Sequence, residues 1–231
     1  MKTTRNIAIV VAGGEGKRFG DKLPKQYHDL GGKPVITYCL NLFERSDMID
    51  EVVLVVSEDY LAYASGEIVD KCGYRKIKKI TTGGESRQES VHAGLTACPT
   101  GIDLAVIHDA VRPFLAKDLL HKIIETASAT AAAILAVPAK ESVKLVKGKI
   151  VEKTLLRDTV WMAQTPQVFR FDRILEAHER AVAAENEATD DSQLYEQYCG
   201  RVSIVRGSYN NIKITTRGDL VLAEEILRET G

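Results

Sequence analysis

A cluster of glycines followed by two cations is the feature of this chain best suited to chemistry. The apolar run Ile7 to Val11 leads into Ala12-Gly13-Gly14-Glu15-Gly16-Lys17-Arg18, and Pro24-Lys25-Gln26 follows after a short gap. Glycines let backbone N–H groups approach an anion closely, since no Cβ blocks the approach and a positive φ is allowed. Arg18 and Lys25 can supply charge to a polyphosphate and to a phosphoryl group in transfer. The segment therefore predicts a phosphate-binding loop built on Ala12, Gly13, Gly14 and Gly16.

Two more common glycine motifs do not fit this spacing. The dinucleotide-binding fingerprint would begin at Gly14 and would require a small residue where Phe19 stands. A P-loop would require a glycine at Val11 and Ser or Thr at Arg18. A plain structural turn after a first strand stays open, but the two cations favour phosphate binding. The failed fingerprint weighs against a nicotinamide-dependent oxidoreductase.

A second candidate site follows another apolar run. In Ile107-His108-Asp109-Ala110-Val111-Arg112-Pro113 an acidic residue comes directly after a strand-like segment. Such a carboxylate suits Mg²⁺, which takes one or two protein carboxylates and completes its shell with phosphate and water. Asp109 could instead cap the next helix or pair with Arg112, but its alignment with the glycine loop favours metal binding. We expect His108 to pack or to make a structural hydrogen bond.

Other polar positions carry weaker signals. The segment Thr82 to Ser90 is a glycine turn before a helix-like stretch, which can read a base edge through hydrogen bonds; helix capping by Ser86 or Ser90 is the alternative. Arg157, Lys213 and Ser142 are isolated, and such residues are most often on the surface. The chain has no nucleophile-elbow motif, so no covalent intermediate on the protein is indicated. Cations and one metal without a protein nucleophile are typical of direct phosphoryl or nucleotidyl transfer.

Composition narrows the class of protein. The chain has 231 residues, of which 45% are hydrophobic, enough for one substantial α/β core. A formal charge of −1 gives no basic field for nucleic acid or for an anionic membrane surface. The four scattered cysteines lack metal-site spacing and are expected to be reduced thiols. The first apolar run is too short for a signal peptide or membrane span, so a cytoplasmic enzyme is predicted.

The apolar pattern predicts a parallel sheet with helices on both faces. Strand-like runs alternate with segments of helical period, which is typical of an α/β fold. Right-handed crossovers place the carboxyl ends of such strands on one edge, where the glycine loop would lie. The predicted strands are 7–11, 52–56, 104–107, 133–137 and 202–205, and the predicted helices are 35–44, 118–127, 172–184 and one from 219.

A polar-edged hairpin interrupts this pattern. Residues 142–155 form two short strand-like runs around Lys147-Gly148-Lys149. A two-stranded hairpin is marginally stable alone, so it must pack on something else. A second subunit and the hairpin's own domain are both open from the residues alone. The chain has no internal repeat or linker, so residues 1–231 are expected to form one domain with an arm at about 138–160.

Taken together, these segments resemble the 2-C-methyl-D-erythritol 4-phosphate cytidylyltransferases, which form a CDP-alcohol in the non-mevalonate isoprenoid pathway. The resemblance implies a Rossmann-like three-layer nucleotidyltransferase fold, CTP as substrate, Mg²⁺, and a homodimer whose hairpin arms reach across to the other subunit. The matching segments are Ala12 to Phe19, Pro24 to Tyr27, Gly83 to Val91, His108 to Pro113, Thr165-Pro166-Gln167, Thr189-Asp190-Asp191 and Asn211-Ile212-Lys213.

The resemblance also implies roles for single residues in nucleotide binding. Arg18 and Lys25 match the pair that grips the triphosphate and stabilises the transition state at the α-phosphorus. Asp109 matches the metal-binding acid. Gly84 and Ser90 match contacts to cytosine.

Three further positions match the acceptor side. Arg157 and Lys213 match residues that hold the acceptor phosphate for in-line attack, with Arg157 coming from the other subunit's arm. Ser142 stands where a threonine is usual on the arm, and it keeps the hydroxyl. Gly13 and Phe19 also depart from the family, which usually has Ala and Met there.

Two alternative functions stay open. The ribitol-5-phosphate cytidylyltransferases share the glycine loop, Leu23-Pro24-Lys25-Gln26 and the His-Asp-x-x-Arg-Pro motif. Residues 156–167 and the Thr189-Asp190-Asp191 loop favour methylerythritol phosphate as the acceptor. A non-catalytic nucleotide-binding regulator is the other alternative, and the intact set of Arg18, Lys25, Asp109 and Lys213 argues against it.

Overall fold

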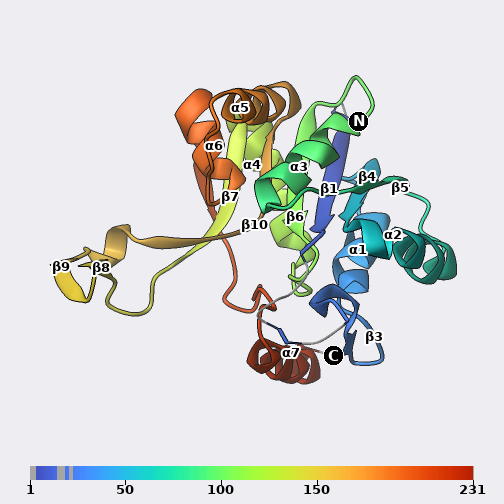
Figure 1. Ribbon diagram of the computed structural model, residues 1–231, viewed down its shortest axis with the longest axis horizontal. Helices are drawn as coiled ribbons and strands as arrows, with labels where there is room; N and C mark the ends of the chain where they lie inside the picture. The colour runs from blue at the N-terminus through green and yellow to red at the C-terminus, as the bar shows by residue number, and fades with distance from the viewer. Residues whose placement is uncertain (1–3, 15–18, 21–22, 231) are drawn as a thin grey trace.

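The computed structural model describes residues 4–14, 19–20 and 23–230. A seven-stranded sheet lies at its centre, in the order β11-β7-β10-β6-β1-β4-β5 (Figure 1). Its strands are β1 (Asn6–Ala12), β4 (Glu51–Val56), β5 (Ile77–Thr82), β6 (Leu104–Asp109), β7 (Ala132–Pro138), β10 (Trp161–Arg170) and β11 (Ser203–Arg206). The helices are α1 (Ile36–Arg45), α2 (Leu61–Tyr63), α3 (Arg87–Thr96), α4 (Lys117–Thr130), α5 (Phe171–Ala183), α6 (Asp191–Tyr198) and α7 (Arg217–Thr230).

Four helical turns and two strand pairs complete the fold. The helical turns are η1 (Lys25–Tyr27), η2 (Glu58–Tyr60), η3 (Ala64–Asp70) and η4 (Arg157–Thr159). The two pairs are β2 (Asp29–Leu30) with β3 (Lys33–Pro34), and β8 (Lys144–Lys147) with β9 (Ile150–Thr154). Among the residues described, no helix is long and apolar enough to cross a membrane.

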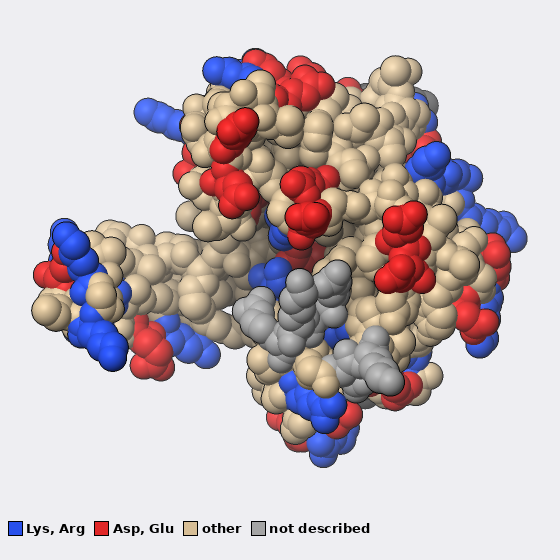
Figure 2. Space-filling model, in the orientation of Figure 1, with Lys and Arg blue, Asp and Glu red and all other residues tan. Residues whose placement is uncertain are grey.

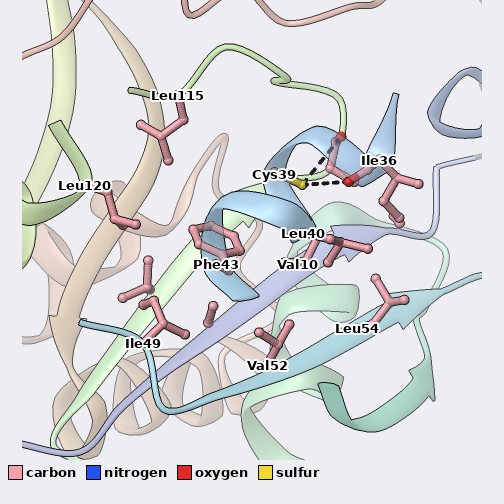
Figure 3. Packing of buried hydrophobic residues seen from close by; sticks show 14 of the residues in the cluster. Val10, Ile36, Cys39, Leu40, Phe43, Ile49, Val52, Leu54, Leu115 and Leu120 are labelled. Carbon is pink, nitrogen blue, oxygen red and sulfur yellow. Dashed lines mark hydrogen bonds between the residues drawn. The ribbon is translucent and has the colours of Figure 1, made fainter. Parts of the chain in front are cut away.

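The predicted parallel sheet with helices on both faces is confirmed. Ala8 and Val10 of β1 pack into one core with α1 and α4, while Ile7 and Ile9 pack into a second core with α3, α5 and α6. Both faces of the strand are therefore buried, which explains its unbroken apolar sequence. Figure 3 shows the first core, where Phe43 of α1 points toward the sheet.

Two strands of the sheet were missed by the sequence pattern. β5 is an edge strand beside β4, and lysines interrupt its apolar run. β10 lies between β6 and β7 and is antiparallel to both. Its sequence contains Pro166, which argues against a central strand. The structure accommodates this proline where the pairing with β7 shifts register between Gln164 and Gln167.

Close contacts fix two helices against the sheet near its carboxyl edge. The Cys39 thiol of α1 donates to the carbonyls of Ile36 and Ala110, at 3.2 and 3.9 Å, and so ties the helix to the chain after β6 (Figure 3). A Cβ added to Gly94 of α3 would lie 2.5 Å from Cγ2 of Ile9. Helix α3 can therefore lie this near the sheet only because residue 94 is a glycine.

The carboxyl ends of β6, β1 and β4 meet at one edge, as predicted, and that of the unpredicted β5 joins them. The register pairs Val11 of β1 with Asp109 of β6, and Ala12 with Val56 of β4. Val56 in turn pairs with Thr82, the last residue of β5. Both glycine turns follow these ends, so the topology brings them to the same place as Asp109.

The predicted hairpin is present as β8 and β9, and every residue in these two strands is exposed. The pair forms a sheet of its own and projects from the body of the molecule (Figure 1). Ile150 of β9 and Leu156, which follows β9, are apolar residues with exposed fractions of 75% and 69%.

Candidate active site

The glycine loop after β1 is held by a buried glutamine. Gln26 of η1 donates its Nε2 to the carbonyl of Ala12 at 2.6 Å and, at 3.4 Å, to that of Gly14. These bonds fix η1 against the loop, and Lys25 is the neighbouring residue. The Pro24-Lys25-Gln26 motif alone does not predict this role for Gln26, because a motif does not reveal which side chain is buried.

A cavity at this edge of the sheet gathers most of the predicted site residues. In Figure 2, Lys and Arg side chains are visible in a recess near the middle of the molecule. Arg18 and Gly16 lie outside the described residues. The predicted residues that line the cavity are Ala12, Gly13, Gly14, Lys25, Gly84, Ser90, Asp109 and Lys213.

Helix α3 begins at the rim of this cavity with a capping box. The Ser86 hydroxyl accepts from the N–H of Glu89 at 3.1 Å, and the Glu89 carboxylate accepts from the N–H of Ser86. Ser86 is therefore the helix cap, and Ser90 is not. The Ser90 hydroxyl donates to the Ser86 carbonyl at 3.0 Å, and its oxygen stands 3.4 Å from where a Cβ on Gly13 would be. Ser90 thus lies at the junction of the two glycine turns.

Asp109 is surrounded by three cations. Its Oδ1 accepts from Nε of Arg87 at 2.9 Å, and its Oδ2 lies 2.9 Å from Nζ of Lys213 and 3.7 Å from Nε of Arg112. Burial alone would raise the pKa of Asp109, but the attraction of Arg87, Lys213 and Arg112 outweighs burial and holds this pKa well below its usual range. The carboxylate is therefore ionised at neutral pH. Asp109 does not cap a helix, because α4 begins at Lys117 with Ala116 as its cap residue.

Buried contacts on both sides position Lys213. Asn211 donates its Nδ2 to the carbonyl of Thr165 at 2.9 Å, and its own carbonyl accepts from Arg112 at 2.8 Å. Ile214 is fully buried, and its N–H donates to Val111. The side chain of Lys213 keeps 36% of its surface exposed. The backbone is thus pinned while the ammonium group reaches the cavity.

His108 is a structural residue, as expected. Its Nε2 lies 3.2 Å from the Arg112 carbonyl, which can only accept, so Nδ1 accepts from the Thr165 hydroxyl at 3.1 Å. The Thr165 oxygen in turn accepts from the N–H of Asp109 at 3.0 Å. Burial lowers the pKa of His108 to about 4. The imidazole is therefore neutral at neutral pH and fixes the backbone beneath Asp109.

A second cavity lies beside the first and shares three residues with it. Arg87, Asp109 and Lys213 line both. The remaining residues of the second cavity are Arg112, Ala163, Gln164, Thr165, Gln167, Thr189 and Asp190. The Thr165-Pro166-Gln167 and Thr189-Asp190-Asp191 segments noted in the sequence thus contribute to this side of the site. The arrangement suits two ligands that meet at one group of charges.

The arm residues of the predicted site stand apart from both cavities. Arg157 begins η4 and Ser142 precedes β8, and neither is among the residues that line the two cavities. In Figure 1 the arm extends away from the sheet edge where Asp109 lies. Within one chain, the structure therefore does not bring Arg157 or Ser142 together with Lys213.

Sequence reasoning assigned no role to Arg87 or Asp191. Arg87 binds Asp109 and also donates Nη1 to Asp191 at 2.8 Å. Both residues were quoted within motifs, but they are 104 positions apart in the chain. Both residues lie in segments that match the family, and this was the one signal in the sequence that could have marked them. Charged residues are rarely buried without a partner, so two such residues in matching segments could have been considered as a pair.

The sheet order, the glycine turns at its carboxyl edge and the cation-ringed aspartate define an α/β protein of the nucleotidyltransferase class. Comparison with known proteins makes this specific. The family model for 2-C-methyl-D-erythritol 4-phosphate cytidylyltransferase (IspD) matches residues 6–229, and the chain belongs to this family.

Individual relatives agree with the family model along the whole chain. The 2-C-methyl-D-erythritol 4-phosphate cytidylyltransferase of Geobacter metallireducens is 42% identical over 226 residues, which cover 96% of this chain and 97% of that protein. The crystal structure of 4-diphosphocytidyl-2C-methyl-D-erythritol synthase from Anaerococcus prevotii matches with a TM-score of 0.87 at 34% identity, over 97% of this chain and 96% of that one. The Thermus thermophilus cytidylyltransferase matches with a TM-score of 0.75 at 27% identity, over 95% and 98%.

Proposed function

We propose that this chain transfers the cytidylyl group of CTP to the phosphate of 2-C-methyl-D-erythritol 4-phosphate, which gives CDP-methylerythritol and pyrophosphate. The observation that carries the proposal is the pair of cavities that share Arg87, Asp109 and Lys213. One cavity has the glycine turns that suit a nucleotide. The other has polar and cationic walls that suit a phosphorylated alcohol.

The nucleotide half combines small residues with Lys25 and the shared cations Arg87 and Lys213. Gly13 and Gly14 leave room for phosphates to approach backbone N–H groups. Lys25 supplies charge to the triphosphate, with Arg18 as its predicted partner. Gly84 and Ser90 line the same cavity at the start of α3 and are the proposed contacts to cytosine. In this proposal the α-phosphorus would lie between Lys25 and the shared cations.

A divalent cation could bind at Asp109 if this carboxylate were its one protein ligand. Among the residues described, no three His, Cys, Asp or Glu side chains form a group that could hold a metal by themselves. Mg²⁺ commonly takes one carboxylate and completes its shell with substrate phosphates and water. Asp109 is acidic, ionised and lines both cavities, so it is the proposed metal ligand. When bound there, Mg²⁺ would neutralise phosphate charge as a Lewis acid.

The transfer needs no covalent intermediate on the protein. An oxygen of the acceptor phosphate forms a bond to the α-phosphorus, and the bond from that phosphorus to the bridging oxygen of the β-phosphate breaks, so pyrophosphate leaves with the electron pair. Lys213, together with Arg157 from the partner's arm, would hold the acceptor phosphate in line. Lys25 and Arg18 stabilise the charge that develops at the α-phosphorus.

The arm is proposed to complete the site of a second subunit in a homodimer. Its exposed apolar residues, such as Leu145, Val146 and Ile150, form a surface that a lone chain would leave in water. A partner that covers them would also place Arg157 and Ser142 next to the other chain's Lys213. Residues 1–231 would then be one nucleotidyltransferase domain, with residues 138–160 as its dimerisation arm.

Heterodimers should reveal whether Arg157 acts across the interface. Arg157→Ala and Lys213→Ala chains, each expected to lose at least about ten-fold in turnover, are co-expressed with different tags and the mixed dimer is purified. One of its two sites then has both side chains intact, so about half of wild-type activity should return. The matched control joins a wild-type chain to a chain with both substitutions, and it should stay inactive. The reverse pattern would show that Arg157 serves its own chain.

A pyrophosphate-release assay tests the reaction itself. CTP with methylerythritol phosphate should release pyrophosphate, while ribitol 5-phosphate should be a much poorer acceptor. A nucleotide-binding regulator would bind CTP and release nothing with any acceptor, which would contradict the proposal.

The proposed location is cytoplasmic, and the free state of all four cysteines is compatible with a reducing compartment.

A further inference from the structure

Arg87 lies where the cavities of the site meet. It lines the nucleotide cavity, the neighbouring acceptor cavity and a small third cavity behind them. It is the first residue of α3, directly after the Ser86 cap. The capping box therefore fixes the backbone from which this side chain extends.

The guanidinium of Arg87 joins two carboxylates from distant parts of the fold. Nε donates to Oδ1 of Asp109 at the end of β6, at 2.9 Å, and Nη1 donates to Oδ2 of Asp191 at the start of α6, at 2.8 Å. A guanidinium is planar and rigid, so its two bonds cannot be adjusted independently. The position of Asp191 therefore affects the orientation of the Asp109 carboxylate through the guanidinium of Arg87.

Asp191 is itself fixed from behind. Its side chain is 1% exposed, and its Oδ1 lies 3.2 Å from Nε2 of His178, a fully buried residue of α5. Asp191 does not line the two main cavities. Burial would raise its pKa, but Arg87 and His178 lower it below the usual value. Asp191 is thus a buried, ionised carboxylate that contacts Arg87 but lies away from both proposed substrate positions.

The two oxygens of Asp109 have different partners. Oδ1 is held by Arg87, while Oδ2 lies toward Lys213, whose side chain is partly exposed. If Asp109 turned about its side-chain bonds, Lys213 would lose the Oδ2 partner that lies 2.9 Å away. Removing such a supporting contact typically reduces metal affinity or activity 10- to 100-fold.

We propose that Arg87, anchored by Asp191 and His178, is a positioning residue that fixes the Asp109 carboxylate so that one oxygen faces Lys213 at the junction of the two cavities. The proposal rests on the roles of Asp109 and Lys213 in the proposed function. It assigns Asp191 and His178, which lie behind the cavity wall, an indirect part in the reaction.

A double-mutant cycle tests the transmission. We expect Asp191→Asn to lower kcat about 10-fold and Arg87→Ala about 30-fold. The double variant should be no slower than Arg87→Ala, because Asp191 acts only through Arg87. Additive losses would overturn the proposal, as would an unchanged kcat in Asp191→Asn. If Asp191→Asn does not fold, His178→Gln takes its place in the cycle.

Guanidinium rescue gives a readout that loss of stability would not reproduce. Guanidinium ion, added below denaturing concentration, should restore several-fold activity to Arg87→Ala, because it can bind between Asp109 and Asp191. The rescue should be absent in the double variant and in Arg228→Ala, which removes an exposed arginine paired with Glu225. Equal guanidinium effects in all variants would contradict the proposal.

Measurements on the wild-type protein distinguish a failure of the proposed reaction from a failure of the proposed role of Arg87. If it does not release pyrophosphate from CTP and the acceptor, the proposed function fails before the cycle is measured. In that case, Mn²⁺-CTP binding measured by calorimetry still tests the positioning, since Asp191→Asn should weaken it only when Arg87 is present. If the wild type is active and the losses add, only the role of Arg87 is wrong.

Discussion

Asp109→Asn is expected to lower kcat/KM for CTP by about 10³-fold, because it removes the one negative charge on which three cations converge. Arg87, Lys213 and Arg112 all lie within ion-pair distance of this carboxylate. The amide keeps the shape of the side chain but carries no charge, so it binds a divalent cation more weakly and cannot balance these cations. The proposed metal ligand and the counter-ion of Lys213 would be lost together.

Mg²⁺ titrations separate these two losses. The Mg²⁺ concentration for half-maximal activity should rise in Asp109→Asn if the carboxylate binds the metal, whereas KM for the acceptor should rise if Lys213 is misplaced. Circular dichroism must show a folded protein, since breaking a buried ion pair costs about 3–5 kcal/mol. Asp118→Asn, on the exposed first turn of α4, is the matched control. Turnover near the wild-type value would remove Asp109 from the active site.

The sequence could predict Asp109 because local signals agreed with the fold. A fully buried strand reads as an unbroken apolar run, so the first polar residue after it falls at the sheet edge. The same reasoning placed Gly13 and Gly14 beside it, and the register of β1 with β6 confirms that the two ends coincide. Parallel topology makes such ends coincide whatever the chain between them does.

The sequence could not predict features that depend on contacts between distant segments. Arg87 and Asp191 are local signals only for helix starts, and their ion pair exists because α3 and α6 lie on the same face of the sheet. Strand β10 contains Pro166, and the shifted register that accommodates it is set by β7. The residues of β8 and β9 are exposed in the structure. Periodicity indicates that they form strands but not what covers them, so the sequence left both choices open.

The structure also changes the interpretation of Lys213, an isolated cation in the sequence. Lys213 was expected on the surface from its isolation in the sequence, and only the family resemblance moved it to the site. Its place follows from Asn211 and Ile214, which are buried on either side of it. The three cations of this cluster, Arg87, Arg112 and Lys213, contact the carboxylates of Asp109 and Asp191, so their positive charge is concentrated where the two cavities meet.

Lys25→Ala should lower kcat by about 10²- to 10³-fold while changing KM for CTP much less. Negative charge at the α-phosphorus increases in the transition state, so a cation nearby contributes more there than to CTP binding. The position of Lys25 is fixed by its neighbour Gln26, which is hydrogen-bonded to Ala12 and Gly14. The turn that carries Lys25 is therefore held against the glycine loop, and loss of the lysine removes a charge that water does not replace.

Steady-state rates with saturating acceptor measure this effect directly. Gln26→Ala should give a smaller loss in kcat with Lys25 still present, because the turn is released from the glycine loop. Lys122→Ala, on the exposed surface of α4, controls for removal of a charge and should be indistinguishable from wild type. Arg18→Ala, the predicted partner, should resemble Lys25→Ala. If Lys25→Ala instead raises KM for CTP and leaves kcat unchanged, Lys25 serves binding and not the transition state.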